Sequence, residues 1–201
     1  MPEVTYDQLI AACKAQEEHW NGKGGAWIPE ADYSFYDTLT DWVPAFVCLM
    51  WLTGGRVSEV LAVRGIDFKF YEKEGREVVA VSLMNLKQPT RSVKESLIVP
   101  DQYPEAWNYI DKYQANIVNQ PGLWFHRRRH TVWYACMKLF GQGPHRAGRH
   151  SWTMEQARVG AQLLDIKQAG GWSALSSMQR YISNFGRDEL IGRKLRVGKV
   201  L

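Results

Sequence analysis

The stretch PHRAGRHSWTMEQARVGAQLLDIKQAGGWSALSSMQRYISNF, from Pro144 to Phe185, is the most informative part of the chain. It contains an arginine–histidine pair near its start, a Gly-Gly-Trp corner in its middle and one tyrosine near its end. Arg149 and His150 open a segment with the apolar spacing of an amphipathic helix, and Tyr181 falls in a last short helix. Glycine turns separate these helices, so the three features can return to one place.

This stretch resembles the C-terminal signature of the tyrosine recombinase (phage integrase) family, which is His-x-x-Arg, then Gly-His or Gly-Trp, then Tyr. Arg149, Trp172 and Tyr181 match that signature without gaps, and the Gly-Gly-Trp corner is most similar to Cre-like members. One position departs from it. The family histidine falls on Arg146, whereas His145 lies one place too early.

A second block, TGGRVSEVL from Thr53 to Leu61, follows an apolar run. Two glycines end one helix, and the next helix begins near Arg56. An arginine at a helix start suits an anion, and Glu59 three residues ahead can pair with it. Taken alone, the pair fits a surface salt bridge better. The block also resembles the family pattern Thr-Gly-x-Arg-x-x-Glu, which implies that Arg56 contacts the scissile phosphate and that Glu59 orients Arg56.

Two segments rich in β-branched residues, Val78–Met84 and Val93–Val99, predict the strands of a hairpin. The resemblance implies that this hairpin carries a catalytic lysine. Lys87, where the first strand ends, matches best, and Lys94 is the alternative. A lysine that only aids solubility is the simpler explanation of either residue.

The other periodic segments are helical, which predicts a mainly α fold with a small antiparallel β-hairpin or sheet. By resemblance this is the tyrosine recombinase (DNA breaking-rejoining enzyme) catalytic core. Thr5 and Gln8 have the capping-box form at the first helix, and a loop is predicted from Trp20 to Ala31. The predicted helices are Thr5–Glu18, Asp41–Leu52, Tyr103–Val118, Thr131–Phe140, Arg146–Leu164 and Ile166–Ala169, with a last one around Tyr181.

With 201 residues and 45% hydrophobic content, the chain is long enough for one domain with its own core. Its net charge of +4 permits a polyanion partner without establishing one. The basic residues are concentrated in the run from His126 to His130 and in the last residues of the chain. A solvated surface explains each run equally well in isolation. The candidate DNA contacts are Arg127, Arg128, Arg129, His145 and His150.

Cys13, Cys48 and Cys136 lie among apolar neighbours without a C-x-x-C pattern, so we expect buried thiols in a reducing compartment. The sequence has neither an 18-residue apolar run nor a signal peptide, which predicts a cytoplasmic protein beside the nucleoid or host-cell DNA. No Cys, His or carboxylate set has metal-ligand spacing, and no cofactor is expected.

The resemblance covers about residues 5 to 185. We expect residues 1–185 to form the catalytic domain and residues 186–201 to form a tail that docks on a neighbouring subunit; packing within the same chain is the alternative. The family's N-terminal core-binding domain, which closes a clamp around DNA, is expected to be absent. The sequence is then either a catalytic fragment or a minimal enzyme, and weak, salt-sensitive DNA binding is expected.

The resemblance implies site-specific recombination of double-stranded DNA for a mobile element or phage, through a 3′-phosphotyrosyl intermediate in a homotetramer. Tyr181 would attack phosphorus, while Arg56 and Arg149 would hold the non-bridging oxygens. Trp172 would add an indole N–H donor, and Lys87 would protonate the leaving 5′-oxygen.

Two alternatives stay open. A type IB topoisomerase shares this chemistry, although it acts as a monomer without strand exchange. A catalytically weakened DNA-binding protein of the same fold is favoured by the missing clamp and by Arg146, which would supply the histidine's donor but would be a poor general base. The presence of Arg56, Lys87, Arg149 and Tyr181 argues against this alternative.

Overall fold

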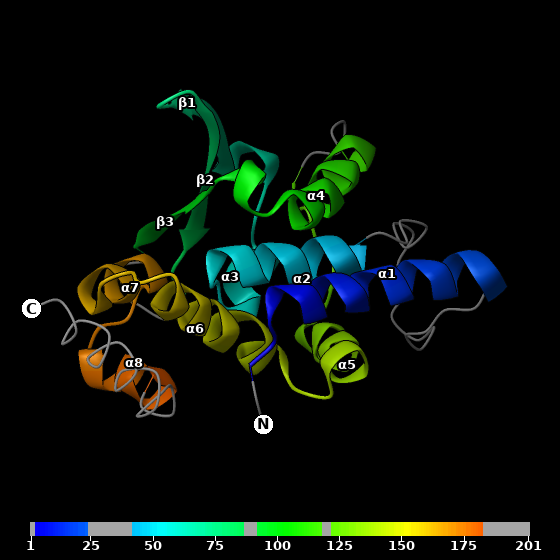
Figure 1. Cartoon of the computed structure of the whole chain (residues 1–201). Helices are drawn as coiled ribbons and strands as arrows, with labels where there is room; N and C mark the ends of the chain where they lie inside the picture. The colour runs from blue at the N-terminus through cyan, green and yellow to red at the C-terminus, as the bar shows by residue number, and fades with distance from the viewer. Residues whose placement is uncertain (1–2, 24–41, 87–91, 118–121, 183–201) are drawn as a thin grey trace, which may run out of the picture.

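The computed structural model describes residues 3–23, 42–86, 92–117 and 122–182. A small sheet lies on one side of a larger helical body (Figure 1). The elements in chain order are α1 (Tyr6–Lys23), α2 (Trp42–Thr53), α3 (Val57–Leu61), the 3-10 turn η2 (Gly65–Asp67), β1 (Phe68–Lys73), β2 (Arg76–Met84), β3 (Val93–Ile98), the 3-10 turn η3 (Pro100–Gln102), α4 (Pro104–Ile117), α5 (Arg129–Phe140), the π-helical turn η4 (Arg146–His150), α6 (Ser151–Arg158), α7 (Leu163–Gly170) and α8 (Leu175–Ile182).

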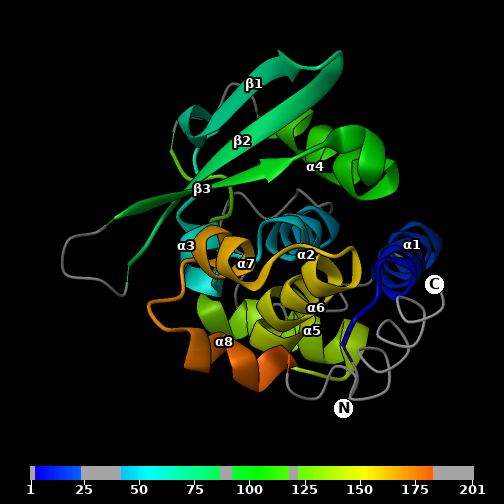
Figure 2. The ribbon, with the colours of Figure 1, turned by 60° about the vertical axis from the view of Figure 1, so that its left-hand side comes forward.

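Helix α2 is the centre of the fold. Every residue from Trp42 to Thr53 is buried, as its apolar sequence predicts. It packs against α4 most extensively and also against α1, α5, α6 and η4, and Figures 1 and 2 show it between these helices. None of the helices in the described ranges is long and apolar enough to span a membrane. The predicted mainly α fold with a small antiparallel sheet is confirmed.

The N-terminal segment is capped at the start of α1 and bonded to the core at Val4. The capping box predicted for α1 is present, with Thr5 N–H donating to Gln8 Oε1 at 3.0 Å and Gln8 N–H donating to Thr5 Oγ1 at 3.3 Å. The Trp51 indole of α2 donates to the Val4 carbonyl at 3.0 Å. Helix α1 continues to Lys23, so the loop predicted from Trp20 begins too early; its remainder lies outside the described residues.

The three cysteines are buried and free, as predicted. Cys13 and Cys48 join α1 to α2, with their sulfur atoms 3.8 Å apart, and Cys136 lies inside α5. Burial raises the pKa of the Cys136 thiol to about 12, which makes it an inert core group.

The sheet has three antiparallel strands in the order β1-β2-β3, one more than predicted. β1 was not predicted: its sequence, FKFYEK, has no β-branched residue and ends in Glu72 and Lys73, and in the structure only Phe68 is buried. The signal for it was the pair Glu74-Gly75, which has positive φ angles of 55° and 72° and closes a two-residue hairpin turn. The register of β2 and β3 pairs Leu83 with Lys94.

The helix predicted from Arg146 to Leu164 is wrong at its C-terminal end. α6 ends at Arg158, because Gly160 takes a φ of +91° and turns the chain. α7 then begins at Leu163, before the predicted start, and ends at Gly170; Gly171 follows it, and its φ of +65° forms the predicted corner.

The turn between α2 and α3 depends on Gly54. Its φ is +59°, and a Cβ added there would lie 2.5 Å from Cδ2 of Trp152. Both the backbone conformation and the close contact with α6 therefore require glycine. This turn positions the start of α3, where the residues of the second sequence block lie.

Gly54→Ala is expected to lower the free energy of unfolding by about 3 kcal/mol, the sum of left-handed strain and overpacking against Trp152. The measurement is urea denaturation. Gly75→Ala is the matched control, since Gly75 has a similar φ of +72° and open space around it, and should cost only about 1 kcal/mol. Equal losses in the two variants would contradict the packing argument.

Candidate active site

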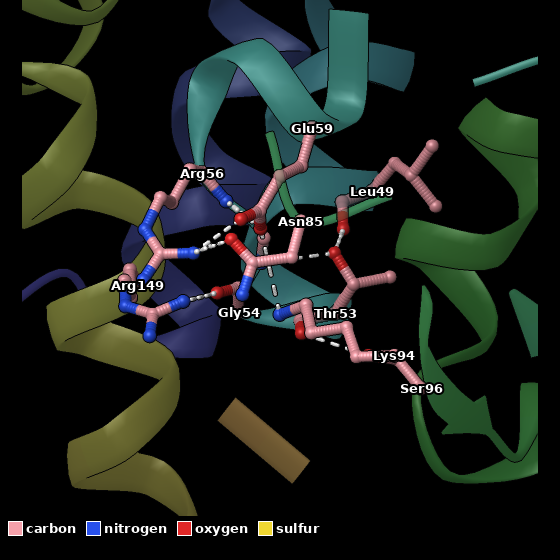
Figure 3. Close-up of polar contacts among 10 residues, drawn as sticks. Leu49, Thr53, Gly54, Arg56, Glu59, Asn85, Lys94, Ser96 and Arg149 are labelled. Carbon is pink, nitrogen blue, oxygen red and sulfur yellow. Dashed lines mark hydrogen bonds and ion pairs between the residues drawn. The ribbon is translucent and has the colours of Figure 1, made fainter. Parts of the chain in front are cut away.

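Arg56 stands at the N-terminal end of α3 and is held by the acid three residues ahead. Its backbone N–H donates to Glu59 Oε2 at 2.9 Å, and its guanidinium forms an ion pair with Glu59 Oε1. The same guanidinium nitrogen donates to Asn85 Oδ1 at 3.3 Å (Figure 3). The predicted Arg56–Glu59 pair is therefore present, and its acid is buried rather than at the surface.

Glu59 is 1% exposed, and its second cation is Lys94, whose Nζ lies 3.7 Å from Oε2. Burial alone would raise the pKa of the Glu59 carboxyl. The Arg56 N–H, the Lys94 charge and the Arg56 guanidinium outweigh burial and lower that pKa below 4.5. The stability that this carboxylate contributes is therefore present above pH 4.5 and is lost as the pH falls through the lowered pKa.

Lys94 reaches the cluster from β3, and its side chain is 9% exposed. Its Nζ is buried and makes no hydrogen bond with the described residues, although it keeps the Glu59 ion pair. Burial lowers the pKa of Lys94 to about 8, the Arg149 and Arg56 charges act in the same direction, and Glu59 opposes them. A lysine with this pKa can give up a proton near neutral pH.

Arg149 lies in η4 and is 2% exposed. Its Nη1 donates to the Gly54 carbonyl at 3.1 Å, which ties η4 to the turn after α2 (Figure 3). Its guanidinium carbon lies 3.9 Å from the centroid of the Trp172 ring, a cation–π contact. Burying an arginine is costly, and the contacts with the Gly54 carbonyl and the Trp172 ring face stabilise the Arg149 charge.

The Gly-Gly-Trp corner places the indole under that arginine. Trp172 is 9% exposed and stacks on Trp152, with ring centroids 6.2 Å apart. A Cβ on Gly170 would fall 1.7 Å from the Trp172 ring, so a side chain there would exclude the indole. The described contact of Trp172 with Arg149 uses the ring face, whereas the sequence prediction assigned a role to the indole N–H.

Sequence reasoning missed Asn85, which is 5% exposed and accepts a hydrogen bond from Arg56. Its only signal is its position, directly after the predicted strand and before the predicted turn. Ser96 was also missed; its hydroxyl donates to the Thr53 carbonyl at 3.1 Å and joins β3 to the end of α2.

The remaining predicted residues of the signature are placed as follows. Tyr181 lies in α8, but its side chain is outside the described part of the structure, as is the whole of Lys87. Arg146 is exposed in η4, and His145 directly precedes that turn and is exposed too. His150 is half-buried; burial and then the Arg146 charge lower its pKa, while Glu3 opposes them.

The basic run lies where α5 begins. Arg128 and Arg129 are exposed, and Arg127 lies with its guanidinium carbon 4.9 Å from the Trp42 ring centroid. These arginines and residues of α3, among them Ser58, line a shallow cavity of about 590 Å³. α3 thus carries Arg56 and Glu59 at the cluster and contributes Ser58 to this second basic region.

The fold of the chain resembles known structures, although comparison of the sequence alone finds no match. No model of a known protein family matches the chain, and no curated protein sequence matches it significantly. Among the solved structures, the XerH site-specific recombinase bound to difH substrate in a pre-cleavage complex has a TM-score of 0.65 at 12% identity. XerA recombinase has a TM-score of 0.59 at 15% identity, and the Tn1549 transposon integrase in complex with transposon right end DNA has 0.59 at 13%.

The chain therefore has the tyrosine recombinase fold. The match to XerH covers 96% of this chain and 53% of the XerH chain, and the match to XerA covers 100% of this chain and 66% of that one. The match to the Tn1549 integrase covers 98% of this chain and 66% of that one. The chain thus spans about half to two thirds of the lengths of these recombinases.

Within this recombinase fold, three segments far apart in sequence converge: the turn from α2 into α3, strand β3, and the run from η4 to the Gly-Gly-Trp corner. Arg56 and Lys94 pair with one buried carboxylate, Glu59, and the charge of Arg149 acts on Lys94, which leaves a surplus of positive charge. No group of three His, Cys, Asp or Glu in the described ranges could hold a metal ion.

Glu59→Gln is expected to move the pKa of Lys94 below its value of about 8, because the carboxylate that raises it is gone while burial, Arg149 and Arg56 remain. The measurement is an NMR pH titration of the lysine ¹³Cε signals. Glu95→Gln is the matched control, since Glu95 is an exposed neighbour on β3. An unchanged or raised Lys94 pKa in Glu59→Gln would show that the two groups are not coupled.

Proposed function

We propose that this chain cleaves and rejoins DNA strands as a site-specific recombinase, with Tyr181 as the nucleophile. The observation that supports this most is the cationic cluster in which Arg56 and Lys94 pair with the buried Glu59 while the charge of Arg149 acts on Lys94. A surplus of fixed positive charge at a partly open site suits a phosphodiester. The likeness to XerH and Tn1549 integrase, whose structures contain DNA substrates, favours DNA as the source of that phosphate.

The reaction is a transesterification. The Tyr181 hydroxyl releases its proton to solvent water and its oxygen forms a bond to phosphorus, while the bond from phosphorus to the 5′-oxygen breaks and that oxygen takes up a proton. The products are a 3′-phosphotyrosyl ester and a 5′-hydroxyl. Because the ester keeps the energy of the original bond, a 5′-hydroxyl from another strand can reverse the step and rejoin the DNA.

The two arginines would stabilise the charge that develops on the non-bridging oxygens. Each guanidinium has several N–H donors in one plane, which match two phosphate oxygens. Glu59 holds Arg56 through both its backbone and its side chain, so Arg56 is oriented before the substrate arrives. Arg149 is oriented by the Gly54 carbonyl and the Trp172 ring.

Lys94 is the candidate general acid that its surroundings favour. It lies in the cluster, its pKa is lowered to about 8, and its buried Nζ makes no hydrogen bond with the described residues. It would give its proton to the leaving 5′-oxygen and become a neutral amine. Lys87, which matches the family pattern best, lies outside the described residues and is kept as the competing assignment.

Arg127, Arg128 and Arg129 would position the duplex through its phosphates, a contact that carries no sequence information. We further propose that the chain acts as a homotetramer on double-stranded DNA, with residues 186–201 docking on a neighbouring subunit.

The proposed function predicts a covalent protein–DNA adduct that depends on Tyr181. The chain is incubated with a pool of random nicked duplexes, in which loss of the short 5′-hydroxyl strand traps the adduct, and the products are separated by denaturing electrophoresis. Wild type should form the adduct and Tyr181→Phe should not. Tyr71→Phe, an exposed tyrosine on β1, is the control and should behave as wild type. Absence of an adduct in wild type, or its persistence in Tyr181→Phe, would refute the proposal.

The role of Lys94 predicts rescue by a better leaving group. Lys94→Ala should slow cleavage of ordinary DNA by about 10²–10⁴-fold, the usual contribution of a positioned acid. With sulfur in place of the bridging 5′-oxygen, the leaving thiolate needs no proton, because a thiol has a pKa of about 8.5. Cleavage of that DNA by Lys94→Ala should approach the wild-type rate. Lys87→Ala is compared in parallel, and sulfur rescue of Lys87→Ala alone would transfer the role to Lys87.

A further inference from the structure

The helix that carries Arg149 is not regular. η4 is a π-helical turn between His145 and α6, and the Ser151 N–H bonds to the Arg146 carbonyl, five residues back. The Ser151 hydroxyl donates to the same carbonyl at 2.9 Å. π-helical turns are rare, occur as single turns within α-helices and are frequent at functional sites.

This turn changes which residue stands beside Arg149. In an α-helix a carbonyl accepts from the N–H four residues ahead, and in a π-helical turn from the N–H five ahead. Counted from any one residue, the residue five ahead in a π-helical turn therefore has the position that the residue four ahead has in an α-helix. In the same way, the residue four ahead has the α-helical position of the residue three ahead. His145, four residues before Arg149, thus lies where an α-helix would place the residue three before it. The sequence, read as a regular helix, gives that place to Arg146.

The charges that act on two groups of the site agree with this shift. At His150, the charges of Arg146 and of Glu3 in the N-terminal segment both act. Burial is the first cause of the lowered pKa of His150, and the Arg146 charge is the second. At Lys94, by contrast, the arginines that act are Arg149 and Arg56.

We propose that His145, placed beside Arg149 by the π-helical turn, contacts the scissile phosphate by donating an imidazole N–H to a non-bridging oxygen, and that Arg146 does not. This inference rests on the proposed function and deepens it. His145 is exposed where η4 begins, so a DNA phosphate can approach it. The chain then departs from the His-x-x-Arg pattern only by one extra residue between His145 and Arg149, which the wider π-helical turn accommodates.

Point variants separate the two residues. In the adduct assay, His145→Ala should slow the reaction about 10²–10³-fold, which is the typical loss when one hydrogen-bond donor to the transition-state oxygens is removed. The DNA affinity and the thermal midpoint of this variant should be unchanged. His145→Asn, which keeps an N–H donor, should recover at least about tenfold of that loss, which a purely structural role would not predict. Arg146→Ala should stay within about threefold of wild type. A large loss in Arg146→Ala with a normal His145→Ala would overturn the inference.

Deletion of Arg146 tests the register itself. It removes the extra residue, closes the turn into an α-helix and leaves His145 three residues before Arg149, in the sequence His-Ala-Gly-Arg. We expect this variant to retain wild-type activity with an equal or higher thermal midpoint, and to lose that activity when His145→Ala is added. A folded but inactive deletion variant would overturn the inference. If the deletion variant fails to fold, the point variants decide.

A third measurement does not depend on cleavage. Imidazole ¹⁵N chemical shifts are recorded as a nicked duplex is added to the wild-type protein. The His145 signal should move more than the His150 signal, and the reverse would contradict the assignment. If the protein forms no adduct but the His145 signal moves as expected, the proposed chemistry fails while the place of His145 beside the phosphate stands.

Discussion

The buried carboxylate of Glu59 is the interaction on which the site depends. A carboxylate that is 1% exposed must be paired, and Glu59 obtains its partners from its own helix and from the sheet. Arg56 binds it through backbone and side chain, while Lys94 approaches from β3. Because one anion faces several cations, the pairing leaves positive charge available for a phosphate. The same carboxylate thus holds α3 to the sheet and prepares the site for an anion.

Three glycines let the helices of the site pack closely against one another and against the core. Gly54 lies against Trp152, and a Cβ on Gly148 would lie 2.5 Å from Cγ of Met50, which lets η4 pack directly on α2. Gly170 leaves room for Trp172, whose ring then lies against the Arg149 guanidinium. Each of these glycines stands where a helix carrying a functional residue meets the core. The signature therefore contains residues with proposed chemical roles and glycines that allow those residues to approach one another.

Most of the fold could be predicted from local patterns, and the errors have different physical origins. The apolar α2 and the capping box of α1 are encoded in neighbouring residues, so they were predictable. β1 was missed because most of its residues are exposed and its sequence has no β-branched residue, and the end of α6 was misplaced because a single glycine, Gly160, can either continue a helix or end it with a positive φ. The π-helical turn could not be predicted, because it depends on which carbonyl each N–H bonds to, and residue identities do not reveal that. If His145 has the role proposed for it, the same register explains why the sequence pattern was matched to Arg146.

The central claim is that Arg56, Arg149 and Tyr181 meet at one phosphorus atom. The most direct measurement is the crystal structure of the chain with a duplex that forms the adduct and with orthovanadate, whose five-coordinate geometry imitates the transition state. We predict vanadium bonded to the Tyr181 oxygen, equatorial oxygens within hydrogen-bond distance of both arginines, and the Lys94 amine beside the leaving 5′-oxygen. Vanadate bound away from Arg56 and Arg149, or held there without Tyr181, would contradict the account.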